Sequence, residues 1–248
     1  MSNQTYARPA LLVAHTRSGG TMLNYALSTH RRIFWTRGEP LLRQMEWGKA
    51  FPGVTNTQIL DCITRASFYT VAGCKVTYEQ MTPGIWKWIK EKQPRLLHLV
   101  RENWIRVALS QMITGMVVTQ RLKHRAHSFK KLKTPKVYIN PQSLLARANR
   151  QQVDRARMVK LLARTGAPIL NLTYKQITGG KVEVDQIPRG VAEKICDFLG
   201  VRYEHLTCDL RRVNRAPLSE IIENWEDVRL AVGSSSYRKL IEGKDNAG

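Results

Sequence analysis

Residues 9–23 read PALLVAHTRSGGTML, and this stretch decides the fold prediction. Its apolar run, residues 9–14, predicts a buried strand. The two glycines that follow predict a tight turn, and the residues after them predict a helix. In a strand–turn–helix of this kind, backbone N–H groups converge at the start of the helix and favour an anion there.

The side chains of the turn suit the same anion. Gly19 and Gly20 let the backbone approach it closely. Arg17 adds a planar cationic fork, and Ser18 and Thr21 add hydroxyl donors. We therefore predict an oxyanion site in this turn; a purely structural glycine turn is the alternative interpretation.

The turn departs from the Walker pattern of nucleotide hydrolases, G-x-x-x-x-G-K-[ST]. No lysine follows Gly20, and no aspartate ends a predicted buried strand, where it would hold Mg²⁺. A sulfuryl group carries less negative charge than a phosphoryl group, and its transfer can proceed with cationic side chains and hydrogen bonds. The sequence therefore favours sulfuryl transfer, and we expect no metal.

The composition is dominated by positive charge. The 248 residues contain 40 Lys and Arg against 19 Asp and Glu, which gives a net charge of +21. Such a field attracts polyanions: nucleic acid, anionic glycan, anionic lipid or a multiply phosphorylated cofactor. No apolar run approaches the ~20 residues of a membrane span, and the first residues lack a signal-peptide pattern. We expect a globular cytoplasmic protein without a transmembrane segment.

Cysteine spacing gives no sign of a metal site or a disulfide framework. No two cysteines form a C-x-x-C pair. We expect buried, reduced thiols at all four positions, which are Cys62, Cys74, Cys196 and Cys208.

Short apolar runs alternate with longer helical patterns along the chain, which predicts a parallel sheet flanked by helices. Strands are expected at residues 10–14, 69–76, 95–100, 137–139 and 169–172. Helices are expected at residues 21–28, 82–92, 103–120, 141–165, 188–199, 217–224 and 225–232. The fold class is therefore α/β, a P-loop-like three-layer α/β/α arrangement with a mostly parallel central sheet. We expect one domain over residues 1–248, with its core at about residues 9–240.

A second anion site is predicted where the strand at residues 95–100 ends. Arg101 follows that strand, and ligands of open α/β sheets bind at the carboxyl ends of the strands. Ser110 lies on the next predicted helix, from which it can meet Arg101 at one phosphate. Taken alone, Ser110 is equally well an ordinary helix serine.

Two further features point towards a substrate. Residues 121–136, RLKHRAHSFKKLKTPK, hold seven Lys or Arg and no acid. They form either a solvated basic loop or a lid-like insertion that contacts an acidic substrate, through His124 and His127 among others. Lys75, at the end of a predicted strand, is a candidate contact to sulfate or substrate; a structural ion pair is the alternative.

In their order along the chain, these motifs resemble the PAPS-dependent sulfotransferases of the bacterial carbohydrate and nodulation-factor type. Residues 16–21 are similar to that family's 5′-phosphosulfate loop, and Arg101 with Ser110 is similar to its 3′-phosphate motif. The resemblance continues at residues 28–30, 38–40, 73–75, 172–175, 198–201, 212–214 and 222–225. It departs from the family at Gly20, where a threonine is common, and at Arg17, where many members have lysine.

The resemblance implies transfer of a sulfuryl group from PAPS (3′-phosphoadenosine 5′-phosphosulfate) to a hydroxyl, with the acceptor aligned in line. It implies that Arg17 and the turn hold the 5′-phosphate and the transferring group. Arg101, Ser110 and Arg212 would hold the 3′-phosphate. The expected acceptor is a saccharide or glycolipid, and the basic segment favours an anionic glycan or a lipid-linked sugar.

The general base is predicted to be the carboxylate of Glu39, which lies between a glycine and a proline in a basic stretch. His15 and Glu46 are the alternatives. His98, inside a predicted buried strand, is expected to be a hydrogen-bonded core histidine.

Two other functions fit parts of the sequence. One is a nucleotide kinase or hydrolase with a degenerate P-loop, against which the absent lysine and aspartate count. The other is a basic nucleic-acid-binding protein without catalysis, for which no known module pattern is present and no specific nucleic acid is expected.

Overall fold

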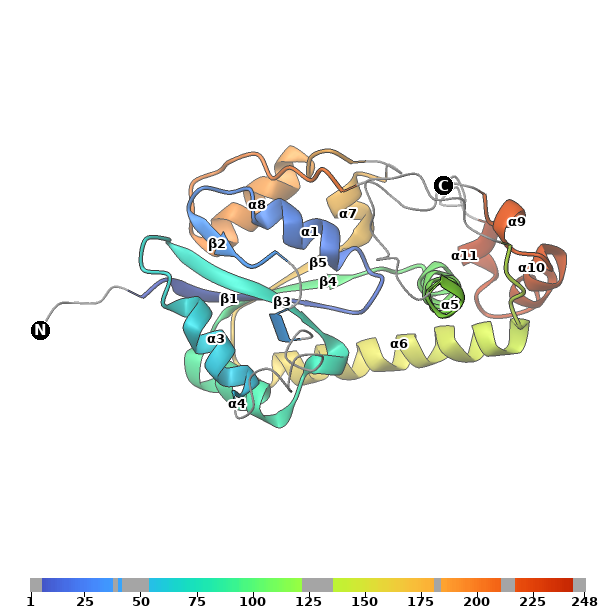
Figure 1. The fold of residues 1–248 in the computed structure, drawn as a ribbon, viewed down its shortest axis with the longest axis horizontal. Helices are drawn as coiled ribbons and strands as arrows, with labels where there is room; N and C mark the ends of the chain where they lie inside the picture. Colours follow the sequence, from blue (N-terminus) through green and yellow to red (C-terminus); the bar gives the residue numbers. More distant parts are fainter. Residues whose placement is uncertain are drawn as a thin grey trace, which may run out of the picture.

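The computed structural model describes residues 6–37, 40–41, 54–121, 136–180, 184–210 and 217–242 of the chain. Within these residues, five strands form one sheet in the order β2-β3-β1-β4-β5, and every pairing is parallel. The strands are β1 (Arg8–Ala14), β2 (Ile33–Trp35), β3 (Val71–Thr77), β4 (Arg95–Val100) and β5 (Ile169–Thr173). Helices cover both faces of the sheet (Figure 1), which confirms the predicted α/β class.

The strand register brings the carboxyl ends of the central strands together. Ala14, the last residue of β1, pairs with Thr77 of β3 on one side and with Leu99 of β4 on the other. Val100, the last residue of β4, pairs with Thr173 of β5. The loops that follow these strands therefore start from one edge of the sheet, which is where open α/β sheets bind ligands.

Different helices cover the two faces of the sheet (Figure 1). Helices α1 (Gly20–Leu27) and α8 (Arg189–Leu199) lie on one face, and α3 (Asn56–Thr64), α4 (Pro83–Lys92) and α6 (Pro141–Ala163) lie on the other. Helix α4 starts as predicted, because the Oγ1 of Thr82 accepts a hydrogen bond from the N–H of Ile85. Helix α8 ends as predicted at Gly200, which has a φ of 67°.

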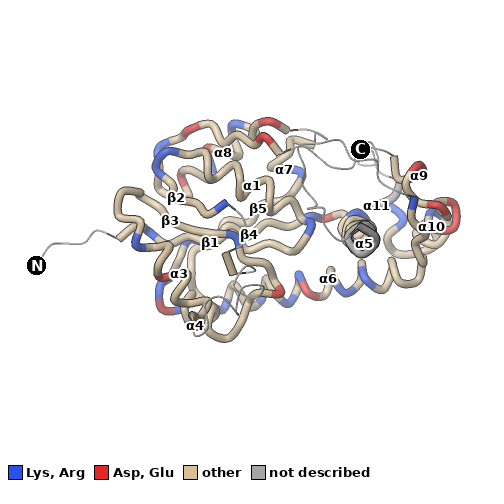
Figure 2. The backbone as a smooth tube through the Cα atoms, in the orientation of Figure 1, with Lys and Arg blue, Asp and Glu red and all other residues tan. Residues whose placement is uncertain are grey.

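The remaining helices are α5 (Trp104–Arg121), α7 (Tyr174–Thr178), α9 (Leu218–Ile221), α10 (Trp225–Gly233) and α11 (Arg238–Glu242), with a short 3₁₀ turn, η1 (Tyr78–Gln80). Helix α7 packs through Ile177 on the same face as α1 and α8, whereas α5, α9, α10 and α11 lie beyond the sheet (Figure 1). Side chains of α5, α6, α9 and α10 share one buried cluster. The long helix α6 joins this cluster to the sheet, and Lys and Arg positions recur along it (Figure 2).

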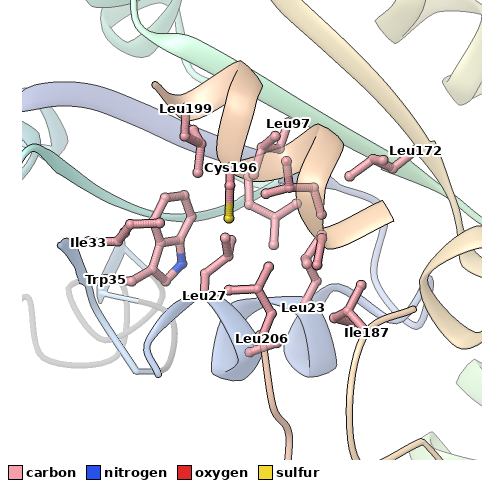
Figure 3. Close-up of a cluster of buried hydrophobic side chains, with 14 of the residues drawn as sticks. Leu23, Leu27, Ile33, Trp35, Leu97, Leu172, Ile187, Cys196, Leu199 and Leu206 are labelled. Atoms are coloured by element: carbon pink, nitrogen blue, oxygen red, sulfur yellow. The ribbon is translucent and has the colours of Figure 1, made fainter. Parts of the chain in front are cut away.

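The cluster beneath α1 and α8 fixes the position of the glycine turn. It packs Leu23 and Leu27 of α1 against the sheet and against Cys196 of α8 (Figure 3). Gly73 of β3 lets Trp35 pack closely, since a Cβ at Gly73 would lie 2.6 Å from the Trp35 ring. With α1 held in this way, the turn that precedes it is held over the end of β1.

Some predicted elements are wrong or incomplete. Residues 137–139 are not a sheet strand: Val137 makes one isolated bridge to Ile222, and its side chain is buried in the cluster around α5 and α6. An apolar run this short fits a helical cluster as well as a sheet. The sequence patterns did not predict β2, α3, α7 or α11, and helix α6 ends at Ala163 instead of residue 165.

The cysteine prediction is wrong at one position. Cys74, Cys196 and Cys208 are buried, and burial raises the pKa of Cys74 to about 12. Cys62, on α3, is exposed. In the part of the chain that the structure describes, no helix has the length and apolar character that a membrane crossing requires.

Candidate functional site

The glycine turn connects β1 to α1 through two residues with left-handed backbone conformations. Arg17 has a φ of 66° and Gly19 a φ of 92°. The N–H and the Oγ of Ser18 both donate to the carbonyl of His15, at 3.2 and 2.6 Å, and close the turn. No side chain caps the first turn of α1, so its N-terminal N–H groups are available to an anion.

Close packing requires glycine at position 19 and leaves little room for a side chain at position 20. A Cβ on Gly19 would lie 2.5 Å from the ring of Tyr174, on the first turn of α7. A Cβ on Gly20 would lie 3.1 Å from the Cβ of Ala14 and 3.2 Å from the Cδ of Lys75. The turn is thus held between an aromatic ring on one side and a lysine side chain on the other.

Arg17 is bound to the helix that follows β4. Its Nε donates a 3.0 Å hydrogen bond to the Oγ of Ser110, on α5. Burial lowers the pKa of Arg17 from its ordinary value, although an arginine remains a cation at neutral pH. The structure therefore pairs Ser110 with Arg17, whereas the sequence suggested that it would act with Arg101.

Lys75 brings a second cation to the start of α1. It points from β3, where it pairs in register with Leu12 of β1, and is 5% exposed. Its Nζ donates a 3.2 Å hydrogen bond to the Oγ1 of Thr21, in the first turn of α1. A buried ammonium group at a helix N-terminus favours an anionic ligand.

Arg101 follows β4 as predicted and reaches the other side of the turn. Its guanidinium carbon lies 4.4 Å from the centroid of the Tyr174 ring, the ring that packs on Gly19. Tyr174 is itself fixed at the start of α7 by a capping box, in which Thr173 and Gln176 bond to each other's backbone N–H. Arg101 is half-buried and held beside the glycine turn by this stack.

A chain of hydrogen-bonded polar side chains lies near the turn, in which His98 is buried, Tyr78 half-buried and Asn171 exposed. The Oη of Tyr78 lies 2.6 Å from the Nε2 of His98, and the Nδ1 of His98 lies 2.9 Å from the Oδ1 of Asn171. Because the Asn171 oxygen accepts from Nδ1–H, Nε2 accepts from the Tyr78 hydroxyl. His98 is thus a hydrogen-bonded core histidine, and burial lowers its pKa while the bond to Asn171 opposes that shift.

A small pocket lies between the turn, the end of β4 and helix α6. It is lined by apolar and polar side chains, namely His15, Ser18, Tyr78, Val100, Arg101, Trp104, Val107 and Arg155. Sequence reasoning missed Tyr78, Arg155 and, beside the pocket, Tyr174. The one available signal was that Tyr78 directly follows the end of β3.

Several predicted site residues lie outside the described residues. These are Glu39, Glu46, Arg212, His124 and His127, together with residues 122–135 of the basic segment. Within the described ranges, no cluster of three His, Cys, Asp or Glu side chains is placed to hold a metal ion.

No protein-family model matches the chain, and no curated protein matches it in sequence. Among solved structures, a sulfotransferase from Alicyclobacillus acidocaldarius is 15% identical, with a TM-score of 0.50 over 95% of this chain and 93% of that chain. The sulfotransferase domain of the Synechococcus PCC 7002 olefin synthase is 18% identical, with a TM-score of 0.41 over 82% and 76% of the two chains. Retinol dehydratase, in a complex with retinol and PAP, is 14% identical, with a TM-score of 0.35 over 79% and 61%. At these identities, the likeness to the first structure shows the fold alone.

Proposed function

We propose that this chain is a sulfotransferase that moves a sulfuryl group from PAPS to a hydroxyl acceptor. One observation carries the proposal: two cationic groups, Lys75 and Arg101, flank the same uncapped helix start at the carboxyl ends of parallel strands. A donor with a phosphosulfate at one end and a separate phosphate at the other needs positive charge at two places. The motif order along the sequence supports the same activity.

The turn fits the phosphosulfate end of this donor. The N–H groups at the start of α1 lack a side-chain cap, and the tight packing at Gly19 and Gly20 leaves the backbone as the surface that meets the ligand. Arg17 and Lys75 add the charge that stabilises a leaving phosphate, and Ser18 and Thr21 belong to the same turn. PAPS supplies the sulfuryl group, and these residues orient it for in-line attack.

Arg101 and Ser110 are proposed to hold the 3′-phosphate, with Arg212 as a third ligand. The half-buried Arg101 is kept in place by the Tyr174 ring, and Ser110 sits on α5, beside the turn. A planar guanidinium suits a phosphate because it donates two parallel hydrogen bonds.

Glu39 is proposed as the general base that takes the proton of the acceptor hydroxyl. The acceptor is proposed to be a saccharide or glycolipid, and His124 and His127 of the basic segment are proposed to contact it. We further propose a single cytoplasmic domain that needs no metal. These assignments rest on the sequence.

A thermal-shift experiment tests the donor. We expect adenosine 3′,5′-bisphosphate at about 100 times its Kd to raise the free energy of unfolding by roughly 2.7 kcal/mol. ATP with Mg²⁺ and single-stranded DNA serve as the comparison ligands. A clear response to ATP with Mg²⁺ beside none to the bisphosphate would favour the kinase or hydrolase alternative, and a response to DNA alone would favour nucleic-acid binding.

A transfer assay tests the reaction. It follows the release of adenosine 3′,5′-bisphosphate from PAPS in the presence of a panel of neutral and anionic saccharides. We expect release to depend on one class of acceptor and to persist in EDTA. If the bisphosphate binds but no saccharide supports release, the acceptor class is wrong while the donor assignment stands.

A further inference from the structure

The outward side of helix α6 carries a row of basic side chains to which the proposed sulfuryl transfer assigns no role. Lys and Arg positions recur along this helix in Figure 2. The members of the row are exposed and are spaced by three, four or seven residues, which places them on one side of a helix. They are Arg147, Arg150, Arg157, Lys160 and Arg164. The buried side chains of α6 lie on its other side, so the row faces away from the protein core.

The row is long and straight. A helix rises 1.5 Å per residue, so Arg147 and Arg164 are separated by about 25 Å along its axis. Helix α6 contains one acid, Asp154, whose carboxylate lies 3.9 Å from the Nε of Arg150. This exposed pair offsets part of one charge, and the other cations of the row remain available to an anionic partner.

An apolar side chain lies within the row. Val153 is 58% exposed. It follows Arg150 by three residues and precedes Arg157 by four, so the three side chains are neighbours on the helix surface. A purely ionic partner gives this valine no favourable contact, whereas the headgroup region of a lipid bilayer accepts apolar and cationic side chains together.

The basic surface extends from α6 to the end of α4. The Nε2 of Gln93, the C-cap residue of α4, donates a 3.0 Å hydrogen bond to the carbonyl of Thr165, just beyond α6. Lys90 and Lys92 are exposed in the last turn of α4, and the acid between them, Glu91, is paired with another lysine of the same helix. Two elements therefore give this surface breadth as well as length.

We propose that this basic face, formed by α6 and the end of α4, binds the surface of an anionic phospholipid membrane. Phospholipid headgroups form a plane that the whole row can meet at once, and each cation near it adds to the attraction. A phosphate strand of B-DNA turns once around its axis in about 34 Å, so it curves away from a straight row ~25 Å long. Helix α6 also has no aromatic residue on which the bases of a single strand could stack. The proposal does not depend on the sulfuryl-transfer activity.

Vesicle sedimentation tests the proposal on the full chain. One set of vesicles contains phosphatidylcholine alone, and the other also contains phosphatidylglycerol. We expect binding to the second set only, and weaker binding as the salt concentration rises. The test variant combines Arg147→Gln, Arg157→Gln and Lys160→Gln, since glutamine forms helix about as well as the residues it replaces. Each cation near an anionic surface contributes roughly a fivefold factor, so the partition coefficient should fall by roughly 100-fold.

The matched control removes the same charge from the other face of the sheet. It combines Arg189→Gln, Lys194→Gln and Arg202→Gln, at exposed positions in and after α8, and it should bind the anionic vesicles nearly as well as wild type. Equal losses in the two triple variants would overturn the proposal, because they would show an effect of net charge alone. So would a failure of the wild-type protein to bind the anionic vesicles.

Two further arms separate binding from folding and from other polyanions. Melting curves check each variant; if the α6 variant is unfolded, Arg157→Gln alone, expected to cost roughly fivefold, decides the matter. Arg157→Lys keeps the charge and should bind like wild type, and a loss as large as that of Arg157→Gln would contradict attraction by charge. If the wild-type protein binds double-stranded DNA or dextran sulfate and not the vesicles, the face is a site for a soluble polyanion and the membrane proposal is wrong.

Discussion

The Nε of Arg17 donates a 3.0 Å hydrogen bond to the Oγ of Ser110, which lies 93 residues later in the chain. This bond connects the turn after β1 to the helix after β4, two elements that leave the same edge of the sheet. Arg17 also sits in a left-handed backbone conformation, with a φ of 66°, which is uncommon for a residue other than glycine. The bond to Ser110 therefore holds a strained residue in the orientation that the turn requires.

Ser110→Ala removes the partner of Arg17 and is expected to weaken adenosine 3′,5′-bisphosphate. A hydrogen bond to a charged group contributes about 1.5–3 kcal/mol, so the Kd should rise by roughly tenfold or more. Calorimetry measures the change, with Ser143→Ala, an exposed position on α6, as the control. A Kd that matches wild type would show that the Arg17–Ser110 bond does not organise the site.

Gly19→Ala is expected to displace Tyr174 and with it Arg101. Gly180→Ala is a matched control, because Gly180 also has a positive φ, 75°, but a Cβ there meets nothing within 4 Å. Both variants should lose about 1–3 kcal/mol of stability through backbone strain. Only Gly19→Ala should also lose bisphosphate affinity, and equal affinities in the two variants would exclude the Tyr174 contact as the cause.

Lys75→Met is expected to abolish most sulfate transfer while leaving the fold intact. Methionine fills the volume of the lysine chain and removes the charge beside Thr21, which should lower turnover by roughly 100-fold. Melting temperature should change little, because no charge is then desolvated in the core. The transfer assay and a melting curve measure both quantities, with the exposed Lys90→Met as control. Near-normal turnover would remove Lys75 from the site.

His98→Gln is expected to flatten the pH dependence of stability below neutral pH. Burial lowers the folded-state pKa of His98 beneath its unfolded value of about 6.5, so the unfolded chain takes up a proton first as the pH falls. Stability from the neutral histidine is therefore present above about pH 6.5 and is lost as the pH falls towards the lower folded-state pKa. Melting curves between pH 7 and 5 test this; His205→Gln, at an exposed position, should keep the wild-type slope.

Glu39→Gln is expected to reduce sulfate transfer by roughly 100-fold or more at saturating substrate, because general-base catalysis contributes on this scale. The Kd of the bisphosphate should stay near wild type, because the proposed role of Glu39 is to take the proton of the acceptor and not to hold the donor. Turnover close to wild type in the transfer assay would show that another group, such as His15 or Glu46, takes the proton.

The sequence predicts most securely what depends on neighbouring residues. The strand–glycine–helix unit around Gly19 could be predicted from a short stretch of sequence, because its apolar run, its turn residues and the start of its helix all lie within fifteen positions. Arg101 was predicted at a strand end from the apolar run before it. Strand β2 was missed because a run of three residues is too short to show an alternating pattern. Residues 137–139 were predicted to be a strand for the same reason, and in the structure they are not one.

The contacts that shape the candidate site are not local, which is why pattern reasoning did not find them. Tyr174 meets Gly19 across more than 150 residues, and Arg155 reaches the pocket from a helix whose many basic residues look alike in sequence. Only the packing of α6 against α5 distinguishes Arg155 from Arg157. Such differences between residues depend on tertiary contacts and leave no hydrophobic pattern in the sequence.

Cys62 is a suitable position for selective chemical labelling of this protein. It is the exposed cysteine of the four, and the other three are buried, with the pKa of Cys74 raised to about 12. Since a thiolate is the reactive form, a maleimide dye at neutral pH should attach to Cys62 alone. Helix α3 carries this position on the α4 and α6 side of the sheet (Figure 1). The natural sequence can therefore be labelled at one site without mutagenesis.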